Sequence, residues 1–205
     1  MSARTIRLLL ADDQALVRGA LAALLNLEPD LTVVVEVGSG DQVLDAVREH
    51  RPDVALLDVE MPGMDGISAT AAVRQSFPDT RVLIVTTFGR PGFLRRAMQA
   101  GAAGFVVKDT PAPQLADAVR RVHSGLRVVD PALATDSLVA GESPLTARET
   151  EVLQAARDGS TVATIAKRLF LSEGTVRNHL SSAIGKTQAA NRAEAVLIAD
   201  NNGWL

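Results

Sequence analysis

The first 125 residues alternate between two hydrophobic periods, and this alternation limits the folds that the chain can adopt. Short runs rich in leucine and β-branched residues are separated by segments in which apolar residues recur at helical spacing. The runs lie at residues 5–11, 32–37, 53–57, 81–86 and 104–107. Strands that are apolar throughout indicate a parallel sheet covered by helices on both faces. We therefore predict a five-stranded α/β sandwich over residues 1–125.

Composition narrows the class of protein further. Hydrophobic residues make up 47% and charged residues 22% of the 205 residues, which is typical of a globular chain and excludes a disordered or fibrous one. Cysteine is absent, which excludes disulfide frameworks and thiolate chemistry. No apolar run approaches the roughly 18 residues that a membrane-spanning helix needs. We expect a soluble, cytoplasmic protein with no membrane insertion.

The alternation stops after residue 125. Residues 126–143 gain proline, glycine, serine and acids, and we predict a linker there. Residues 144–205 show only helical patterns, beginning with a capping box formed by Thr146 and Glu149. Two short apolar stripes flank a tight turn at residues 170–172, which is the helix-turn-helix pattern. We predict a separate four-helix domain over residues 144–205.

Chemically reactive side chains follow four of the predicted strands. Asp12 and Asp13 follow the first, Asp58 the third, Thr86 ends the fourth, and Lys108 follows the fifth. The carboxyl ends of parallel strands meet at one edge of a sheet, so we expect these groups to lie together. Converging carboxylates repel one another unless a cation lies between them, and hard oxygen ligands suit Mg²⁺. A carboxylate held there can attack a phosphoryl group, which Thr86 and Lys108 can stabilise.

Each of these residues also has a plain structural interpretation. Asp12 and Asp13 can cap a helix, Asp58 can lie in a loop, Thr86 can reflect strand propensity, and Lys108 can be solvated. The four features occurring together, with a suitable residue type at each strand end, favour the phosphoryl-transfer hypothesis.

Four segments of the first 125 residues resemble the receiver domain of two-component response regulators. They are residues 9–14 (LLADDQ), 57–66 (LDVEMPGMDG), 85–87 (VTT) and 104–109 (GFVVKD). The resemblance implies a flavodoxin-like, doubly wound sheet of strand order 2-1-3-4-5. It implies Asp58 as the phosphoacceptor and a Mg²⁺ site formed by Asp13, Asp58 and the Glu60 carbonyl, assisted by Asp12. Thr86 and Lys108 would hold the phosphoryl group. Phe105 would be an aromatic residue that changes position on phosphorylation, although it could be a static core residue. Pro62 and Gly63 would shape the loop beside Asp58.

The last domain resembles the LuxR/GerE-type DNA-binding domain. The matching segments are residues 145–153 (LTARETEVL), 165–169 (IAKRL), 171–180 (LSEGTVRNHL) and 191–195 (NRAEA). With a receiver in front, the arrangement is similar to the NarL/FixJ family. Residues 24–28 (LLNLE) and 86–93 (TTFGRPGF) also resemble the desaturase-regulator subgroup.

The second helix of the helix-turn-helix carries the residues suited to reading DNA. Its apolar positions Val176, Leu180, Ala183 and Ile184 are expected to face inward. We predict base-edge contacts from Arg177, Asn178 and Ser181, because arginine pairs with guanine and asparagine with adenine. Phosphate contacts are predicted for the remaining polar candidates, which are Lys167, Thr175, His179, Lys186 and Arg192. His179 could instead only pack or cap, and the whole face could be merely solvated.

Two features of this domain depart from the family pattern. Gly185 and Thr187 stand where a helix-forming polar residue and leucine are usual, so we expect the helix to fray or end near Lys186. The final helix offers Ala195, Ile198 and Ala199 as a dimer face, or as domain core.

These observations predict a phosphorylation-activated transcription regulator. A sensor histidine kinase would phosphorylate Asp58, the protein would form a homodimer, and paired helix-turn-helix domains would bind promoter DNA. It would not be an enzyme beyond catalysing its own phosphoryl transfer and dephosphorylation. The alternatives are an aspartyl phosphatase and a phosphate-independent DNA-binding protein with a decayed receiver.

Overall fold

The computed structural model describes residues 5–87, 89–131, 133–135 and 143–205. The chain folds into two compact units, residues 1–89 with 94–134 and residues 90–93 with 135–205. We call them the N-terminal unit and the C-terminal unit. Each has its own cluster of buried apolar side chains. No helix in the described part of the chain is long and apolar enough to cross a bilayer.

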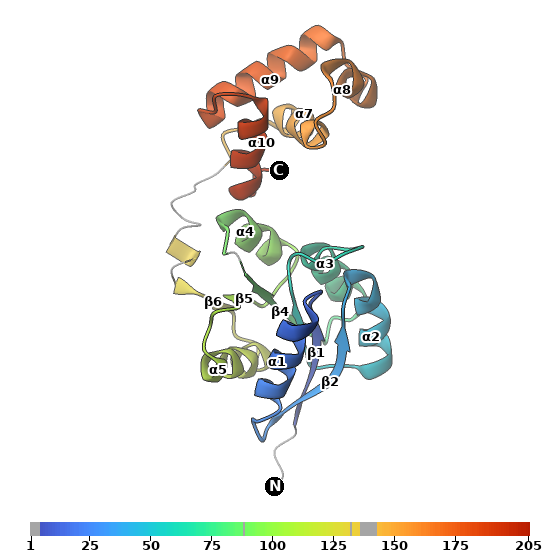
Figure 1. Cartoon of the computed structure of the whole chain (residues 1–205), viewed down its shortest axis with the longest axis vertical. Helices are drawn as coiled ribbons and strands as arrows, with labels where there is room; N and C mark the ends of the chain where they lie inside the picture. The colour runs from blue at the N-terminus through green and yellow to red at the C-terminus, as the bar shows by residue number, and fades with distance from the viewer. Residues whose placement is uncertain (1–4, 88, 132, 136–142) are drawn as a thin grey trace. The chain divides into compact units, whose positions relative to one another are not determined.

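A parallel sheet forms the centre of the N-terminal unit (Figure 1), and its order in the described residues is β2-β1-β3-β4-β5-β6. The first five strands begin and end within one residue of the predicted runs, and their predicted order is confirmed. The near-continuous burial of β1, β3, β4 and β5 explains why apolar residues dominate them, whereas β2, at the edge of the sheet, is only partly buried. The strands are β1 (Ile6–Ala11), β2 (Leu31–Val37), β3 (Val54–Leu57), β4 (Arg81–Thr86), β5 (Gly104–Val107) and β6 (Val128–Val129).

The sixth strand corrects two predictions, a five-stranded sheet and a linker that begins at residue 126. Val128 donates its backbone N–H to the carbonyl of Ala103 at 3.0 Å, and Asp130 donates to Phe105 at 3.4 Å. These bonds join β6 to the β5 edge in parallel register. A strand of two residues is too short to show an alternating pattern, so the sequence carried no signal for it. Residues 136–142 of the predicted linker lie outside the described residues.

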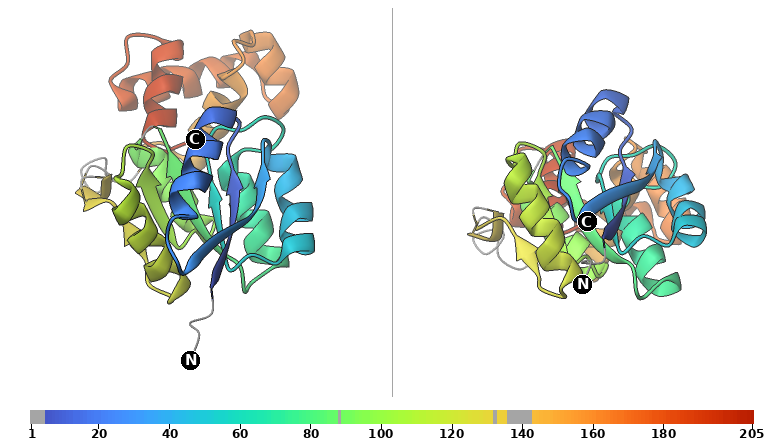
Figure 2. Two further views of the ribbon diagram at one scale, coloured as in Figure 1. Left: turned by 60° about the horizontal axis from the view of Figure 1, so that its bottom comes forward. Right: turned by 90° about the horizontal axis from the view of Figure 1, so that it is seen from below.

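Helices cover both faces of the sheet (Figure 2). Helix α1 packs against α5, and α2 packs against α3. The core beside α5 contains Leu8, Leu56 and Leu83 from the strands and Val119 from the helix. The helices of this region are α1 (Ala15–Leu25), α2 (Val43–His50), α3 (Gly66–Ser76), α4 (Pro91–Gln99) and α5 (Ala112–His123), with a 3₁₀ turn at Gly40–Gln42.

The apolar stripe of α1 is not buried as a unit. Leu25 is 1% exposed, whereas Leu16 is 86% and Leu24 is 44% exposed. The helix therefore carries leucines on the surface of the N-terminal unit.

Four helices form the C-terminal unit, as predicted, within its described residues. Each begins at a side chain that accepts a backbone N–H: Thr146, Thr161, Ser172 and Asn191 are the N-caps. Such caps satisfy donors that the first turn of a helix leaves unpaired. The helices are α7 (Ala147–Ala156), α8 (Val162–Leu169), α9 (Glu173–Thr187) and α10 (Arg192–Asn201).

Helix α9 passes through Gly185 and ends one residue beyond Lys186, close to where we expected it to end. It continues to Thr187, and Gln188 then closes it in the left-handed conformation, with φ of 55°. The Thr187 hydroxyl donates to the carbonyl of Ala183 at 2.8 Å and is buried with it. The hydrogen bond and burial of Thr187 offset the low helix propensity of Gly185.

Glu149 links α7 to α9 through its buried carboxylate. It completes the predicted capping box by accepting the Thr146 N–H at 2.7 Å. The same side chain accepts hydrogen bonds from the Ser182 hydroxyl at 2.7 Å and the Lys186 ammonium at 2.8 Å, both on α9. A helix start and the placement of a second helix therefore depend on one carboxylate.

We predict that Glu149→Gln weakens the C-terminal unit at neutral pH but not in acid. Burial acts to raise the pKa of Glu149, but hydrogen bonds from Lys186, Ser182 and Thr146 outweigh it and lower the pKa from 4.5 to about 2. The ionised carboxylate contributes stability that is complete above about pH 4.5 and is lost as the pH falls toward 2. At pH 7 the variant should lose about 2 kcal/mol of unfolding free energy.

Denaturant unfolding followed by the fluorescence of Trp204 measures this effect, because the only tryptophan in the sequence packs against the C-terminal core. Glu151→Gln is the matched control, since Glu151 is exposed on the same helix and pairs with Arg148. The control should lose less than about 0.5 kcal/mol. Equal losses in the two variants, or a loss for Glu149→Gln that does not shrink between about pH 5 and 3, would contradict the assignment.

Candidate functional site

Three of the predicted site residues are joined by direct contacts at the carboxyl edge of the sheet. Asp12 follows β1, Asp58 follows β3 and Lys108 follows β5. The Lys108 ammonium lies 2.7 Å from Oδ2 of Asp12 and 2.7 Å from Oδ2 of Asp58. All three side chains are at most 10% exposed. The expectation that parallel strand ends bring these groups together therefore agrees with the geometry.

Backbone contacts hold this site in place. Asp58 donates its N–H to the carbonyl of Ala11 at 2.9 Å, and Lys108 donates to the carbonyl of Thr86 at 2.8 Å. Gly66 begins α3 directly against the backbone of Asp58, where a Cβ would lie 1.9 Å from the Asp58 carbonyl oxygen. Only glycine permits this approach, so the loop from β3 to α3 can close tightly behind the carboxylate.

Burial and charge act in opposite directions on the site. Burial raises the pKa of Asp58, with a further rise from the neighbouring Asp12, and the hydrogen bond from Lys108 only partly opposes it. For Lys108, burial acts to lower the pKa, but hydrogen bonds to Asp12 and Asp58 outweigh it and raise the pKa. The ammonium therefore stays charged between two buried carboxyl groups whose mutual repulsion it relieves.

Asp13 completes a set of oxygen ligands that fits a divalent cation. One carboxylate oxygen each from Asp12, Asp13 and Asp58 lies within 4.8 Å of the others. Asp13 is exposed while the other two are buried, so the cluster opens to solvent on one side. Hard carboxylate oxygens with open positions for water suit Mg²⁺. Glu60, whose carbonyl is the other predicted ligand, lies exposed in the loop after β3.

Asp12 also has a local structural role, and it contacts a residue that the sequence analysis did not single out. Its Oδ1 accepts the N–H of Gln14 at 2.9 Å, at the start of α1. The Arg18 guanidinium donates to the Asp12 carbonyl at 2.5 Å and lies 3.6 Å from Glu36. Arg18 falls one turn along α1 and looked like an ordinary surface charge in the sequence, so only the folded chain identifies its place beside the acidic cluster.

The remaining receiver candidates lie on the neighbouring strands. Thr86 ends β4 and is 2% exposed. Phe105 lies in β5 opposite Ile84 of β4 and is fully buried. The aromatic ring is therefore already inside the N-terminal unit in this structure, which fits both an inward switch position and a static core residue.

The predicted DNA-reading face lies along α9. Arg177, Asn178 and Ser181 are exposed, whereas Val176, Leu180 and Ala183 are buried in the core of the C-terminal unit, as expected. Arg177 pairs with Glu173 one turn earlier at 2.7 Å, on the solvent side of the helix.

The side chains predicted to contact phosphates differ in their exposure and in their hydrogen-bond partners. Lys167 is exposed, while Thr175 and His179 are half-buried. The Thr175 hydroxyl shares a 2.8 Å hydrogen bond with the Ser172 hydroxyl. Lys186 is bound to Glu149, and Arg192 donates to the carbonyl of Ser160 at 2.7 Å. Lys186 and Arg192 therefore have structural partners within the unit itself.

The suggested dimer face on α10 is largely wrong. Ala195 and Ala199 are fully buried in the core of the C-terminal unit, so they are not available to a second copy. Ile198 is only half-buried. The alternative, that these positions belong to the domain core, holds for both alanines. The sequence could not decide between the two, because the spacing of alanines indicates a shared helix face but not what covers that face.

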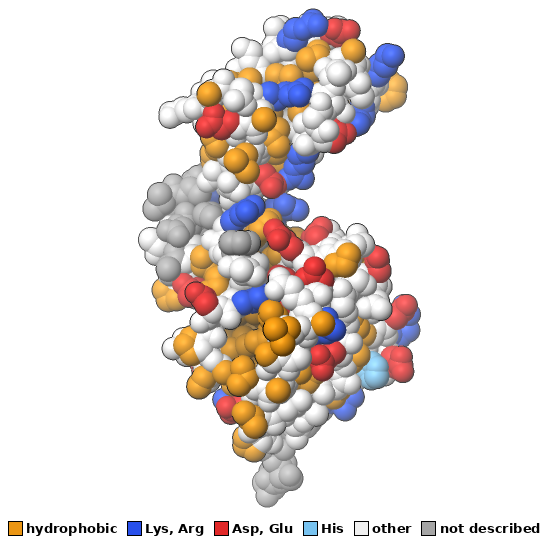
Figure 3. Space-filling model, viewed as in Figure 1, with side chains coloured by type: hydrophobic (Ala, Val, Ile, Leu, Met, Phe, Trp, Pro, Cys, Tyr) orange, Lys and Arg blue, Asp and Glu red, His pale blue; other side chains and the backbone are white. Residues whose placement is uncertain are grey.

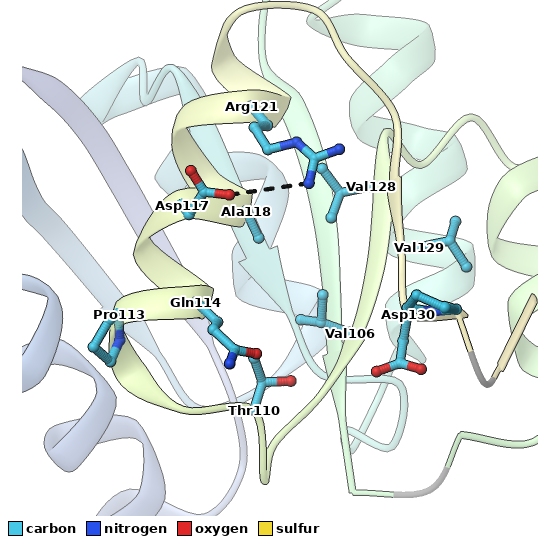
Figure 4. Close-up of a pocket in the computed structure, with 11 residues that line it drawn as sticks. Val106, Thr110, Pro113, Gln114, Asp117, Ala118, Arg121, Val128, Val129 and Asp130 are labelled. Carbon is cyan, nitrogen blue, oxygen red and sulfur yellow. Dashed lines mark ion pairs between the residues drawn. The ribbon is translucent and has the colours of Figure 1, made fainter.

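A cavity of about 560 Å³ lies between α5 and the β5–β6 edge (Figure 4), away from the acidic cluster. Val106 and Val128 line its floor, and Gln114 reaches toward it from α5. At its rim Asp117 pairs with Arg121 at 3.9 Å. None of its lining residues is a predicted site residue.

Family models match both units. Residues 8–120 match the response regulator receiver domain, and residues 143–199 match the bacterial regulatory proteins of the luxR family. The chain is 43% identical over 200 residues to YvfU of Bacillus subtilis (strain 168), an uncharacterized transcriptional regulatory protein, and the match covers 98% of this chain and 100% of that one. DesR, a transcriptional regulatory protein of the same organism, is 40% identical over 200 residues, covering 98% and 99%.

A solved structure also resembles the whole chain. The crystal structure of the response regulator ChrA, from a heme-sensing two-component system, has a TM-score of 0.60 and 34% identity, and the match covers 98% of this chain and 99% of that one. The chain belongs to the two-component response regulators that join a receiver domain to a LuxR-type DNA-binding domain and regulate transcription. The family predicted from the motifs is confirmed. The aspartyl phosphatase alternative is excluded, because these proteins are transcriptional regulators and not metabolic enzymes.

Proposed function

We propose that Asp58 accepts a phosphoryl group from a sensor histidine kinase in the cytoplasm and that this step controls DNA binding. The contact that carries the proposal is the Lys108 ammonium, 2.7 Å from the buried carboxylates of both Asp12 and Asp58. The receiver domain would span residues 1–125, and the DNA-binding domain residues 144–205.

In the transfer step an Asp58 carboxylate oxygen attacks phosphorus. The oxygen–phosphorus bond forms while the phosphorus–nitrogen bond of a phosphohistidine breaks, and the leaving nitrogen keeps the electron pair. Lys108 would exchange its contact with Asp58 for one with a phosphoryl oxygen, and the Thr86 hydroxyl would donate to another. A magnesium ion held by Asp12, Asp13, Asp58 and the Glu60 carbonyl would neutralise charge on the phosphoryl oxygens.

Phosphorylation would then alter the surface of the receiver. The phosphoryl group adds nearly two negative charges and new acceptor oxygens at the edge of the sheet. Thr86 lies on the strand next to Phe105, so a shift of the threonine toward the phosphoryl group changes the space beside the ring. In this interpretation the modification biases two arrangements that are already in equilibrium.

We predict that Asp58→Ala abolishes labelling by a phosphodonor. Incubation with acetyl phosphate and Mg²⁺ should add one phosphoryl group to the wild type, measured by intact-protein mass spectrometry. Asp45→Ala is the control, since Asp45 is an exposed acid on α2 that pairs with Arg48. Labelling of the Asp58→Ala variant to the wild-type extent would overturn the assignment. A DNA affinity that acetyl phosphate does not change would instead support the alternative of a phosphate-independent DNA-binding protein with a decayed receiver.

For DNA we propose that α9 enters the major groove. Its exposed Arg177 and Asn178 side chains support this, because both can make bidentate contacts with purine edges. Ser181 extends the same surface, while Lys167, Thr175 and His179 would contact phosphates. Lys186 and Arg192 could contribute only by giving up their partners inside the unit.

Replacing Arg177 with alanine should reduce discrimination between a specific site and random DNA by about 1–3 kcal/mol. The site is obtained by selecting bound duplexes from a random pool with the phosphorylated wild type, and affinities are compared by fluorescence anisotropy at fixed salt. Arg148→Ala on α7, which removes a charge paired with Glu151, is the control and should keep the discrimination. An equal loss on specific and random DNA would mean that Arg177 contacts phosphate and does not read bases.

We propose that two phosphorylated receivers associate through α1. Leu16 and Leu24 are exposed on this helix, and Leu27 just beyond it is 78% exposed. Apolar side chains gather on this face of the N-terminal unit (Figure 3). Exposed apolar patches of this kind mark interaction surfaces, and a second copy offers an equally apolar partner.

Two glutamates placed on this surface should prevent association without preventing phosphorylation. The Leu16→Glu/Leu24→Glu variant is expected to accept the phosphoryl group yet stay monomeric, whereas the wild type doubles in mass by light scattering with acetyl phosphate and Mg²⁺. Leu197→Glu is the control, because Leu197 is 57% exposed on α10. A monomeric Leu197→Glu variant beside a dimeric Leu16→Glu/Leu24→Glu variant would place the interface on α10 instead.

A further inference from the structure

A second polar cavity lies at the opposite edge of the sheet from the aspartates. It measures about 230 Å³ and is lined by the first two residues of β4, by the segments that precede β5 and β6, and by Arg74 of α3. Because all strands are parallel, their amino ends meet at one edge and their carboxyl ends at the other. The cavity is therefore separate from the acidic cluster.

Three arginines line this cavity and no acidic residue does. They are Arg74, Arg81 at the start of β4, and Arg127 immediately before β6. The Arg74 guanidinium donates to the carbonyls of Pro78 at 2.6 Å and Thr80 at 2.9 Å, which fixes its position. Within the described residues, the guanidinium groups of Arg81 and Arg127 have neither an ion-pair partner nor a hydrogen-bond acceptor.

This arrangement differs from that of other arginines in the same unit. Arg120 is paired with Glu28 and Asp30, and Arg121 at the rim of the cavity in Figure 4 is paired with Asp117. Surface arginines usually find such partners or remain separately solvated. Three that converge on one hollow without a carboxylate concentrate positive potential there.

Arg81 lies close to the turn at Gly125. Gly125 has φ of +93°, which favours glycine, and a Cβ built on it would lie 3.6 Å from Arg81 Nη2. The guanidinium of Arg81 therefore lies over the turn between α5 and β6, facing the cavity that Arg127 lines. A planar guanidinium presents paired N–H donors that match the oxygens of a phosphoryl group.

We propose that this cavity binds a small free phosphoryl anion, of the size of inorganic phosphate or pyrophosphate. Its volume is below the roughly 300–1,000 Å³ of sites for drug-sized ligands, which favours a compact ligand. Arg81 and Arg127 bind the anion through their unpaired donors, and Arg74 adds its charge from a fixed position. The site takes anions without needing Mg²⁺, which distinguishes it from the acidic cluster.

Isothermal titration of the full chain with inorganic pyrophosphate tests the proposal. EDTA in the buffer removes divalent cations, so that the three aspartates hold no metal ion and repel the anion. The ionic strength is kept constant, so that the screening of charges does not change during the titration. The Arg81→Ala/Arg127→Ala variant should bind at least about tenfold more weakly than the wild type. Parallel titration with inorganic phosphate shows whether one or two phosphoryl groups are needed for binding. The proposal is supported if either anion binds the wild type and the double variant binds that anion more weakly.

Matched variants separate a built site from general attraction. Arg48→Ala/Arg121→Ala removes the same charge from two arginines that are paired elsewhere on the N-terminal unit, and it should bind as the wild type does. Arg81→Lys keeps the charge but loses the planar donors, so it should bind more weakly than the wild type and retain the native circular dichroism spectrum. No binding by the wild type, or equal losses in the two double variants, would overturn the proposal.

Discussion

The contact of the Lys108 ammonium with the carboxylates of Asp12 and Asp58 is the interaction on which the receiver site depends. Two carboxylates buried at a sheet edge repel each other, and the lysine ammonium between them relieves part of that repulsion, so both can stay close. The strands supply the geometry, since three separate chain segments end at the same level. The acidic site is thus a direct product of parallel topology rather than of any one loop.

The second unit uses an ionised group in a comparable way. Glu149 accepts hydrogen bonds both from the start of α7 and from α9. The orientation of α9, which carries the exposed Arg177 and Asn178, therefore depends on its contact with α7. Lys186, which the sequence suggested as a phosphate contact, is part of this connection. A residue that looks available in a charge pattern can thus be committed to the fold.

The sequence predicted the parts of the structure that repeat. Five strands were recognisable because each is a largely apolar run of at least four residues between helical patterns. The positions of Asp12, Asp58 and Lys108 followed from where those strands end. β6 was not recognisable, because Val128 and Val129 are too few to form a pattern. Periodicity also cannot tell which part of an apolar stripe is covered, so Leu16 was exposed while Ala195 and Ala199 were buried. Arg18 and the arginine cavity depend on distant segments meeting, which no local pattern records.

The parallel sheet keeps opposite charges at its two ends. β4 begins at Arg81 and ends at Thr86, so a single strand about 20 Å long separates the arginine cavity from the edge that carries the acidic cluster. Chemical events at one end cannot touch those at the other. An anion bound at the arginines would therefore not contact a phosphoryl group or a metal ion at the other edge, so both places could be occupied at the same time.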